Sequence, residues 1–202
     1  MRIAIIGTGR VGSTVGAGLA RAGHEVVYGS RTPEKAGHLS APSRSIPEAV
    51  DGAEVVIAAV PGSITREVLA GVGPDALADK VLIDVGNSLT EGFRLSFPNG
   101  SLGATLQQDF PRTRVVKTLN TVSAPLMADP GRLPQTTVFL SGDDAAAKAA
   151  VEGLLGDLGW AAESRIDLGG IETAHGPEHY IFLSMLVARK LDTTEYGIAV
   201  VS

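Results

Sequence analysis

Residues 2–12 read RIAIIGTGRVG and decide the fold class of this chain. The apolar residues 2–6 predict a strand, which leads directly into a G-x-G-x-x-G motif and a helical pattern over residues 11–22. In that context the first glycine permits a tight turn, the second lets a pyrophosphate approach the backbone, and the third lets the helix pack on the strand. We therefore predict that a dinucleotide pyrophosphate binds at this helix N-terminus, through Gly7, Thr8, Gly9, Arg10, Val11 and Gly12. The alternative is a purely structural glycine turn.

Short apolar runs alternate with helical patterns along the rest of the chain. The runs at residues 54–60 and 81–85 are continuous, as in strands that are covered on both faces. This order predicts an α/β fold of the doubly wound, Rossmann-like kind with a mostly parallel sheet. We expect a nucleotide-binding domain over residues 1–140 and a small C-terminal extension of helix and strand over residues 141–202. The expected strands are 2–6, 25–28, 54–60, 80–85, 114–119, 136–140 and 161–166, and the expected helices are 11–22, 33–39, 63–69, 102–109, 144–158 and 177–191.

Composition narrows the class of protein. The chain has 202 residues, enough for one domain with a small addition, and its 17 Lys and Arg against 22 Asp and Glu give a net charge of −5. This balance argues against nucleic-acid binding, which depends on neutralising phosphates. The absence of cysteine excludes disulfides, thiolate zinc sites, iron–sulfur clusters and a cysteine nucleophile. No apolar stretch approaches the ~18 residues of a membrane span, so we expect a cytoplasmic protein without a membrane partner.

The second expected strand ends in YGSRTPEK, residues 28–35, and this segment indicates which dinucleotide binds. NAD-binding units place a carboxylate roughly 20 residues after the glycine motif, where it binds the ribose hydroxyl. Here no carboxylate precedes Glu34, whereas Ser30 and Arg31 can donate hydrogen bonds to a 2′-phosphate and Lys35 lies one helical turn beyond. We therefore predict NADP(H) rather than NAD(H) as the cofactor. The alternative is that Arg31 is a solvated surface residue.

Two further strand ends are expected beside the nicotinamide, because ligands of open α/β sheets bind beyond the carboxyl ends of the strands. Asn120 and Thr121 follow the strand at 114–119 and are predicted to bind the nicotinamide amide or a second ring, with Asn120 also a candidate catalytic residue. Lys117 is a candidate proton donor, and the alternative is that it has a structural role. The alternative for Asn120 is that it only forms a turn. The residues expected at the nicotinamide ribose are Val60, Pro61 and Ser63, the last of which is as well explained as a helix N-cap.

Six segments together suggest a family: GTGRVGS, VYGSRTPEK, VIAAVP, IDVGN, VVKTLNTV and DLGGIET. Over about residues 1–190 the chain resembles the NADP-dependent reductases of the deazaflavin coenzyme F420. The resemblance implies hydride transfer between NADPH and a second flat redox ring, F420 or a flavin, and it places the 2′-phosphate pocket at Ser30, Arg31 and Lys35. The related cytoplasmic domains of ferric-reducing membrane proteins share this fold and pass electrons to a flavin.

The segment at 169–179 is the expected site of the second ligand. Gly169 and Gly170 carry no side chains and would let a flat ring approach, so we predict that they contact it together with His175. His175 and His179 have the i, i+4 spacing of metal ligands. However, Pro177 lies between them and is expected to be the first helical residue, so that the two imidazoles need not share a helix face. We therefore expect no metal site.

Three functions are consistent with the sequence. The first is an NADP(H)-dependent reductase of F420 or a flavin-like acceptor, since hydride exchange between two cofactors needs mainly geometry. The second is an NADP(H)-binding sensor without turnover, and the third is a small carbonyl or imine reductase that uses Lys117 as its acid. No tyrosine is followed by lysine at the fourth position, which disfavours short-chain dehydrogenases. The apolar tail at 197–201 either completes a sheet edge or exchanges between subunits, and we expect a homodimer.

Overall fold

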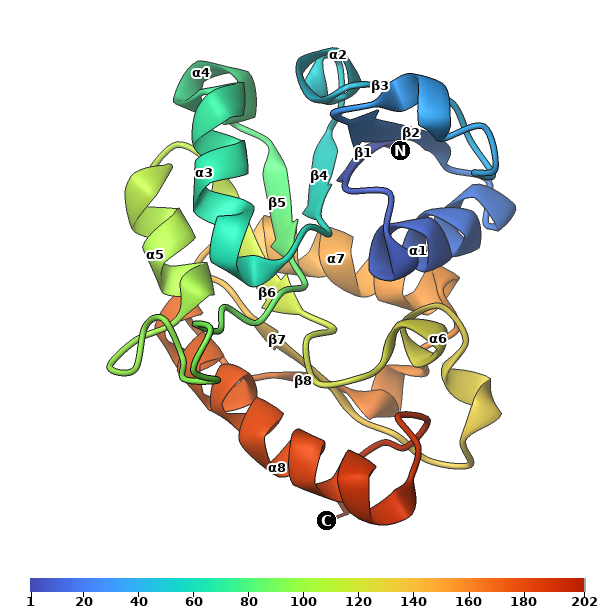
Figure 1. The fold of residues 1–202 in the computed structure, drawn as a ribbon, viewed down its shortest axis with the longest axis vertical. Helices are drawn as coiled ribbons and strands as arrows, with labels where there is room; N and C mark the ends of the chain where they lie inside the picture. The colour runs from blue at the N-terminus through green and yellow to red at the C-terminus, as the bar shows by residue number, and fades with distance from the viewer. Residues whose placement is uncertain (202) are drawn as a thin grey trace.

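The structure is a computed structural model that describes residues 1–201. Its core is an eight-stranded sheet in the order β3-β2-β1-β4-β5-β6-β7-β8 (Figure 1). The strands are β1 (Arg2–Ile6), β2 (Glu25–Ser30), β3 (Ser43–Ser45), β4 (Val55–Ala58), β5 (Val81–Asp84), β6 (Arg114–Thr118), β7 (Val138–Ser141) and β8 (Arg165–Asp167). Every neighbouring pair is parallel except β6 and β7, which are antiparallel. The predicted doubly wound, mostly parallel sheet is confirmed.

Helices cover both faces of the sheet. They are α1 (Arg10–Arg21), α2 (Ile46–Val50), α3 (Gly62–Val72), α4 (Pro74–Leu77), α5 (Leu102–Asp109), α6 (Ala124–Met127), α7 (Ala145–Asp157) and α8 (His175–Leu191). Side chains of α1, α6 and α7 belong to one buried apolar cluster, and those of α2, α3, α4 and α5 belong to the other. Short 3-10 turns lie at Pro33–Lys35, Pro130–Arg132, Ala162–Ser164 and Ile171–Ala174. In Figure 1, α8 crosses below the sheet at the end where the strands β4 and β5 finish.

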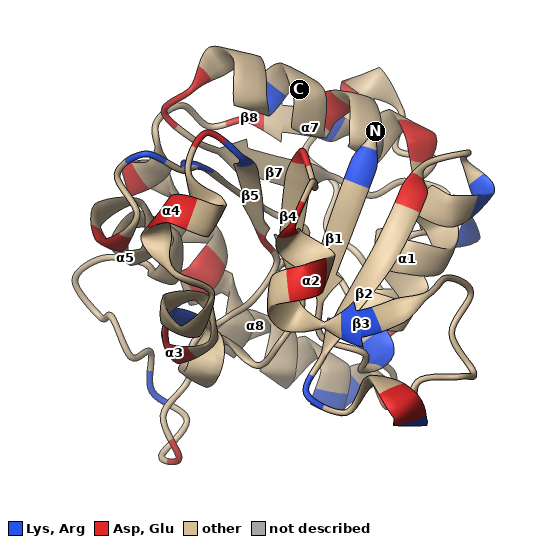
Figure 2. Ribbon diagram, turned by 90° about the horizontal axis from the view of Figure 1, so that it is seen from above, with Lys and Arg blue, Asp and Glu red and all other residues tan. Residues whose placement is uncertain are grey.

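The strand side chains explain why the apolar runs are continuous. In β1, Ile3 and Ile5 point into the cluster under α1 and α7, whereas Ala4 and Ile6 point into the cluster under α2 to α5. Successive residues of a strand face opposite sides of a sheet, so a strand covered on both sides is apolar at every position. Figure 2 shows that lysine, arginine and acidic residues are interspersed over the outer surface in that view.

Several boundaries differ from those expected. The sheet continues through β7 and β8, so the expected division between residues 140 and 141 falls inside β7. The strand β3 and the helices α2, α4 and α6 were not predicted, although α2 carries a local signal: the amide of Ser45 donates to the Glu48 carboxylate at 3.1 Å in a capping box. Within residues 1–201, no helix is long and apolar enough to cross a membrane.

The helix α8 begins at His175, two residues earlier than expected. Pro177 is therefore its third residue, which is tolerated because amides of the first turn have no partner inside the helix. The C-terminal tail folds back on its own chain: the amide of Thr137 donates to the carbonyl of Ile198 at 2.7 Å, just before β7. The tail is therefore hydrogen-bonded within its own chain, and its described residues 192–201 add no strand to the sheet.

Candidate active site

The glycine motif lies at the turn from β1 into α1. Its three glycines differ in whether a side chain would fit at their position. Gly7 has a φ of +114°, and a Cβ there would lie 2.6 Å from the carbonyl oxygen of Ala59. A Cβ on Gly12 would collide with the carbonyl of Gly7. Gly9 has a φ of −75°, which any residue adopts, and a Cβ there would meet nothing within 4 Å. The fold thus requires Gly7 and Gly12, but the fold does not require Gly9.

Open space at Gly9 is what a bound phosphate needs. Gly9 is the N-cap of α1, and none of the described side chains caps this helix end. The first amides of α1 are consequently available to an anion, which the positive end of the helix dipole also attracts. The residues present fit the pyrophosphate of a dinucleotide.

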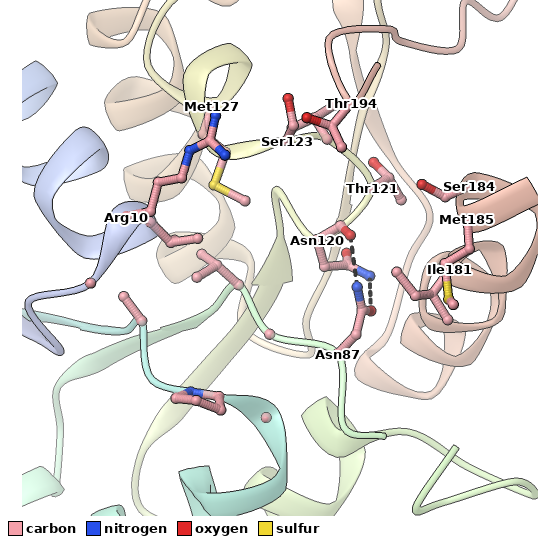
Figure 3. Close-up of a pocket in the computed structure, with 18 of the residues that line it drawn as sticks. Arg10, Asn87, Asn120, Thr121, Ser123, Met127, Ile181, Ser184, Met185 and Thr194 are labelled. Atoms are coloured by element: carbon pink, nitrogen blue, oxygen red, sulfur yellow. Dashed lines mark hydrogen bonds between the residues drawn. The ribbon is translucent and has the colours of Figure 1, made fainter. Parts of the chain in front are cut away.

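A cavity of about 570 Å³ opens beside Gly9 at the carboxyl ends of the strands (Figure 3). This is within the range of small-molecule sites and lies where open α/β sheets bind their ligands. Its walls come from the start of α1, the turns after β4, β5 and β6, the helices α6 and α8, and the C-terminal tail. The lining residues are Gly9, Arg10, Val11, Ala59, Val60, Pro61, Gly62, Val85, Gly86, Asn87, Asn120, Thr121, Val122, Ser123, Met127, Ile181, Ser184, Met185, Ala188, Thr194 and Tyr196.

Two asparagines form a pair at the floor of the cavity. The Asn120 amide donates to Asn87 Oδ1 at 2.9 Å, and the Asn87 amide donates to the backbone carbonyl of Asn120 at 2.9 Å (Figure 3). Next to this pair, the hydroxyl oxygens of Thr121 and Ser123 are buried without a hydrogen-bond partner among the described residues. A buried polar group without a partner costs free energy unless a ligand or water satisfies it. These hydroxyls are therefore available to hydrogen-bond a polar ligand or water in the cavity.

The predicted proton donor Lys117 lies outside this lining. Its ammonium is 2.8 Å from Asp84 Oδ2 and 2.9 Å from Glu178 Oε1, and it also donates to the Gly86 carbonyl. All three side chains are at most 1% exposed. An ammonium has three N–H groups, and these three contacts use them all. The geometry favours the structural alternative for Lys117, because no proton donor is left for a ligand.

Charge and burial act together on this triad of Lys117, Asp84 and Glu178. Burial by itself lowers the pKa of Lys117, but the carboxylates of Asp84 and Glu178 outweigh it and hold that pKa above its ordinary value. Burial raises the pKa of Asp84, although the adjacent Lys117 opposes the change. Lys117 therefore keeps its proton at neutral pH.

Sequence reasoning missed Glu178. Its carboxylate also accepts the backbone amides of Leu102 at 2.9 Å and Gly103 at 3.2 Å, and so caps the N-terminus of α5 from α8. These partners lie 76 and 75 residues away along the chain. No spacing pattern could have identified it.

The residues predicted for the 2′-phosphate lie at the end of β2. Arg31 is exposed and lines a separate hollow of about 310 Å³ with Ile46, Pro47, Ile64 and Val68. Ser30 Oγ accepts the amide of Thr32 at 3.1 Å, and Lys35 is exposed in the following 3-10 turn. Within residues 1–201, neither Arg31 nor Lys35 forms an ion pair. Ser63 is the second residue of α3, whose N-cap is Pro61, so the N-cap alternative for Ser63 is wrong; Ser63 lines a different hollow with Arg66 and Asp109.

Gly169, Gly170 and His175 are not among the residues lining the cavity. The Gly169 carbonyl accepts the amide of Gly142 at 3.0 Å, and a Cβ on Gly170 would collide with the carboxylate of Glu172. Gly169 has a φ of +108°, and both glycines lie in the turn between β8 and the 3-10 turn at Ile171–Ala174, outside the lining of the cavity. The side of the cavity assigned to them is formed instead by α8, through Ile181, Ser184, Met185 and Ala188, and by the tail.

The two histidines share a helix face after all. Because α8 begins at His175, its ring and that of His179 are 6.2 Å apart. The Nδ1 atom of His175 is hydrogen-bonded to the carbonyl of Glu172 at 2.7 Å, and that of His179 to the carbonyl of His175 at 2.7 Å. Among residues 1–201, no group of three His, Cys, Asp or Glu side chains is arranged to hold a metal.

Comparison with known proteins is consistent with this geometry. The family described as NADP oxidoreductase, coenzyme F420-dependent, matches residues 2–88. The crystal structure of a candidate F420-dependent NADP reductase from Arthrobacter sp. FB24 is 36% identical, covers 100% of both chains and has a TM-score of 0.93. A reductive aminase from Aspergillus terreus, solved with NADPH and ethyl-5-oxohexanoate, is 22% identical, covers 94% of this chain and 63% of its own, and shares the fold with a TM-score of 0.71.

A curated relative covers less of the chain. Glycerol-3-phosphate dehydrogenase (NAD(P)+) from Chlorobium phaeobacteroides is 33% identical over 116 residues, which are 48% of this chain and 35% of that protein. The chain thus spans about a third of the length of this relative. The likeness to the Arthrobacter protein, by contrast, extends from end to end and agrees with the family match over the glycine motif. With the open phosphate position at Gly9, these findings show that the chain belongs to the family of NADP oxidoreductases that depend on coenzyme F420, and it is an NADP(H)-dependent enzyme.

Proposed function

We propose that this protein transfers a hydride between NADP(H) and a flat heteroaromatic acceptor, either the deazaflavin F420 or a flavin-like ring. The observation that carries the proposal is Gly9, whose open space at the start of α1 leads directly into the cavity. NADPH supplies the hydride when it is bound. The amides at the start of α1 would hold its pyrophosphate, and the turn at Val60 and Pro61 would lie against its ribose.

The rest of the cavity is suited to positioning a second ring. Asn120 and Thr121 stand at the end of β6, where they can orient the nicotinamide amide or the acceptor. The hydrogen bonds with Asn87 hold the side-chain amide of Asn120 in place, so the orientation of this side chain is set before a ligand binds. Hydride transfer between two cofactors depends chiefly on bringing donor and acceptor carbons together and excluding water. The lining residues of the cavity can supply the first of these by holding the two rings against each other.

The alternatives are less well supported. A carbonyl or imine reductase that uses Lys117 as its acid requires a free ammonium beside the cavity, and the Lys117 ammonium is fully engaged with Asp84, Glu178 and Gly86. A sensor without turnover would fill the acceptor space with side chains, whereas the cavity beside Asn120 is open. Both remain distinguishable by experiment.

The test is the oxidation of NADPH followed by absorbance with purified protein, with F420, FMN, FAD or no acceptor offered in parallel. NADH serves as the control donor. We expect rapid turnover with F420 and NADPH, and slow turnover with NADH. If NADPH binds but none of the three acceptors is reduced, the hydride-transfer proposal is wrong and the sensor alternative gains support.

Arg31 should determine the choice between NADPH and NADH. A hydrogen bond to a charged group contributes ~1.5–3 kcal/mol, so we expect Arg31→Ala to weaken NADPH binding about 10- to 100-fold and leave NADH binding nearly unchanged. The measurement is a fluorescence titration with each dinucleotide. Arg21→Ala removes an equally exposed arginine at the other end of α1 and serves as the control. Equal losses for NADPH and NADH would exclude a 2′-phosphate contact.

We further propose that the chain forms a homodimer through α8. Leu183 and Leu186 on this helix are 56% and 54% exposed, and Phe182 and Met185 lie beside them. A monomer rarely exposes such a contiguous apolar face.

Light scattering coupled to size exclusion tests the dimer. We expect a dimeric mass for the natural chain and a monomeric mass for the double variant Leu183→Glu, Leu186→Glu, since each leucine loses ~1.5–3 kcal/mol of burial per copy. Leu168→Glu, at an exposed leucine after β8, is the control and should stay dimeric. A monomeric natural chain at high concentration would exclude this interface.

A further inference from the structure

The C-terminal segment, residues 192–201, folds back from the end of α8 and crosses to the start of β7; we call it the strap. It begins at Asp192, which has a left-handed φ of 53° and ends the helix. The amide of Thr193 still donates to the carbonyl of Ala188 at 3.2 Å, so the reversal is tied to the last turn of α8. The direction of the strap is thus set from its first residue.

The strap is anchored at several points along its length. Glu195 pairs with Arg132 at 2.8 Å, the amide of Thr137 donates to the carbonyl of Ile198 at 2.7 Å, and the amide of Val200 donates to Thr137 Oγ1 at 3.0 Å. Gly197 is pressed against Thr136, where a Cβ would collide with the threonine hydroxyl. These contacts fix the register of the strap against the start of β7.

This anchoring places two strap residues, Thr194 and Tyr196, in the wall of the cavity. The Tyr196 hydroxyl is hydrogen-bonded to Ser184 Oγ at 2.5 Å, and Ser184 also lines the cavity. Among the described residues of that lining, Tyr196 is the one aromatic side chain. Its neighbour Tyr180 has its pKa raised to about 12 by burial and by Tyr196, so Tyr180 stays neutral at physiological pH.

The turn after β6, which forms another wall of the cavity, contains two hydroxyl groups without a hydrogen-bond partner among the described residues. Thr121 is 7% exposed, and its hydroxyl has no hydrogen bond among the described residues, nor does that of Ser123. In Figure 3, Thr121 and Ser123 come from the turn after β6, and Thr121 faces Ser184 of α8. A ligand between these walls would meet hydroxyls at one side and an aromatic ring at the other.

We propose that the strap forms the acceptor side of the active site and that Tyr196 is the surface on which the flat ring of the acceptor stacks. The inference rests on the proposed function, because it names the part of the cavity that selects the acceptor. Stacking on an aromatic side chain tolerates different flat rings. The hydroxyls of Thr121 and Ser123 would then bind the polar edge of the ring.

The test is a fluorescence titration of the NADP+-loaded protein with FMN and with F420. Tyr196→Ala removes the ring and should weaken binding of both probes roughly 5- to 100-fold, which is the range for lost base stacking. Tyr196→Phe keeps the ring and should stay within about 2-fold of the natural chain, as should NADPH binding in both variants. Equal weakening in Tyr196→Phe and Tyr196→Ala, or no weakening in Tyr196→Ala, would overturn the stacking role.

Hydrogen exchange at the Thr137 amide reports whether the strap is in place, because that amide donates to the carbonyl of Ile198. This measurement does not depend on activity. Gly197→Ala should push the strap from Thr136, accelerate exchange at Thr137 and weaken acceptor binding. Gly176→Ala, at a helical glycine where a Cβ meets nothing within 4 Å, should change neither. Acceptor binding that survives a released strap would overturn the inference.

The outcomes separate this inference from the proposed function. If the natural chain binds FMN or F420 through Tyr196 but reduces neither, hydride transfer is wrong and the strap stands. If it reduces F420 and Tyr196→Ala binds as well as the natural chain, the function stands and the strap inference fails. A natural chain that binds neither probe overturns both.

Discussion

Gly9→Asp is expected to lose at least about 100-fold in NADPH affinity while the fold becomes no less stable. Asp is among the best N-cap residues and its charge suits a helix N-terminus, so at this cap it should leave stability equal or raise it by up to ~1 kcal/mol. The side chain would enter the space at the start of α1 where a Cβ meets nothing within 4 Å. A carboxylate there repels a pyrophosphate, and like charges in contact cost several kcal/mol. Isothermal titration with NADPH and urea unfolding measure the two effects.

Gly153→Asp is the matched control for this variant. It adds the same charge on α7, where a Cβ also has open space, and α7 contributes nothing to the cavity lining. NADPH affinity should be unchanged. If Gly9→Asp binds NADPH as tightly as the natural chain, the space at Gly9 is not the phosphate site, and the glycine motif is a structural turn.

Lys117→Met is expected to be the most destabilising single change in the chain. It leaves the carboxylates of Asp84 and Glu178 buried without their cation. Removing one partner of a buried ion pair costs about 3–5 kcal/mol, since the remaining charge is uncompensated. For a domain of this size that corresponds to a fall of roughly 6–20 °C in the melting temperature. Thermal and urea unfolding measure the loss.

Arg112→Met is the exposed counterpart. Arg112 also lies between two carboxylates, 3.6 Å from Asp75 and 3.2 Å from Asp79, but its side chain is 65% exposed. An exposed ion pair contributes ~0–1 kcal/mol, so this variant should unfold almost like the natural chain. Equal stability losses in the two variants would show that burial does not decide the strength of the Lys117 triad. A Lys117→Met protein that keeps its stability but loses all turnover would restore the catalytic role.

Local signals in the sequence predicted most of the fold. The strand, glycine turn and helix of residues 2–22 are neighbours in the chain, so their periodicity and glycine spacing determine the structure directly. The same holds for the continuous apolar strands β4 and β5, whose patterns report burial on both faces. The α2 helix carries a local signal of the same kind, the capping box of Ser45 and Glu48. Pro177 does not fix the start of α8, because proline is compatible with any position in a first helical turn.

In the candidate site, too, some features depend on residues that are neighbours in the chain and others on residues that are far apart. A few consecutive residues at the end of one strand are enough to predict the glycine turn at Gly9, and the same holds for the proposed 2′-phosphate contact of Arg31. The tertiary structure was needed for the burial of Lys117 between Asp84 and Glu178, and for the position of the strap beside the cavity. Contacts between residues so far apart follow from how the helices pack on the sheet, and no spacing along the chain records that packing.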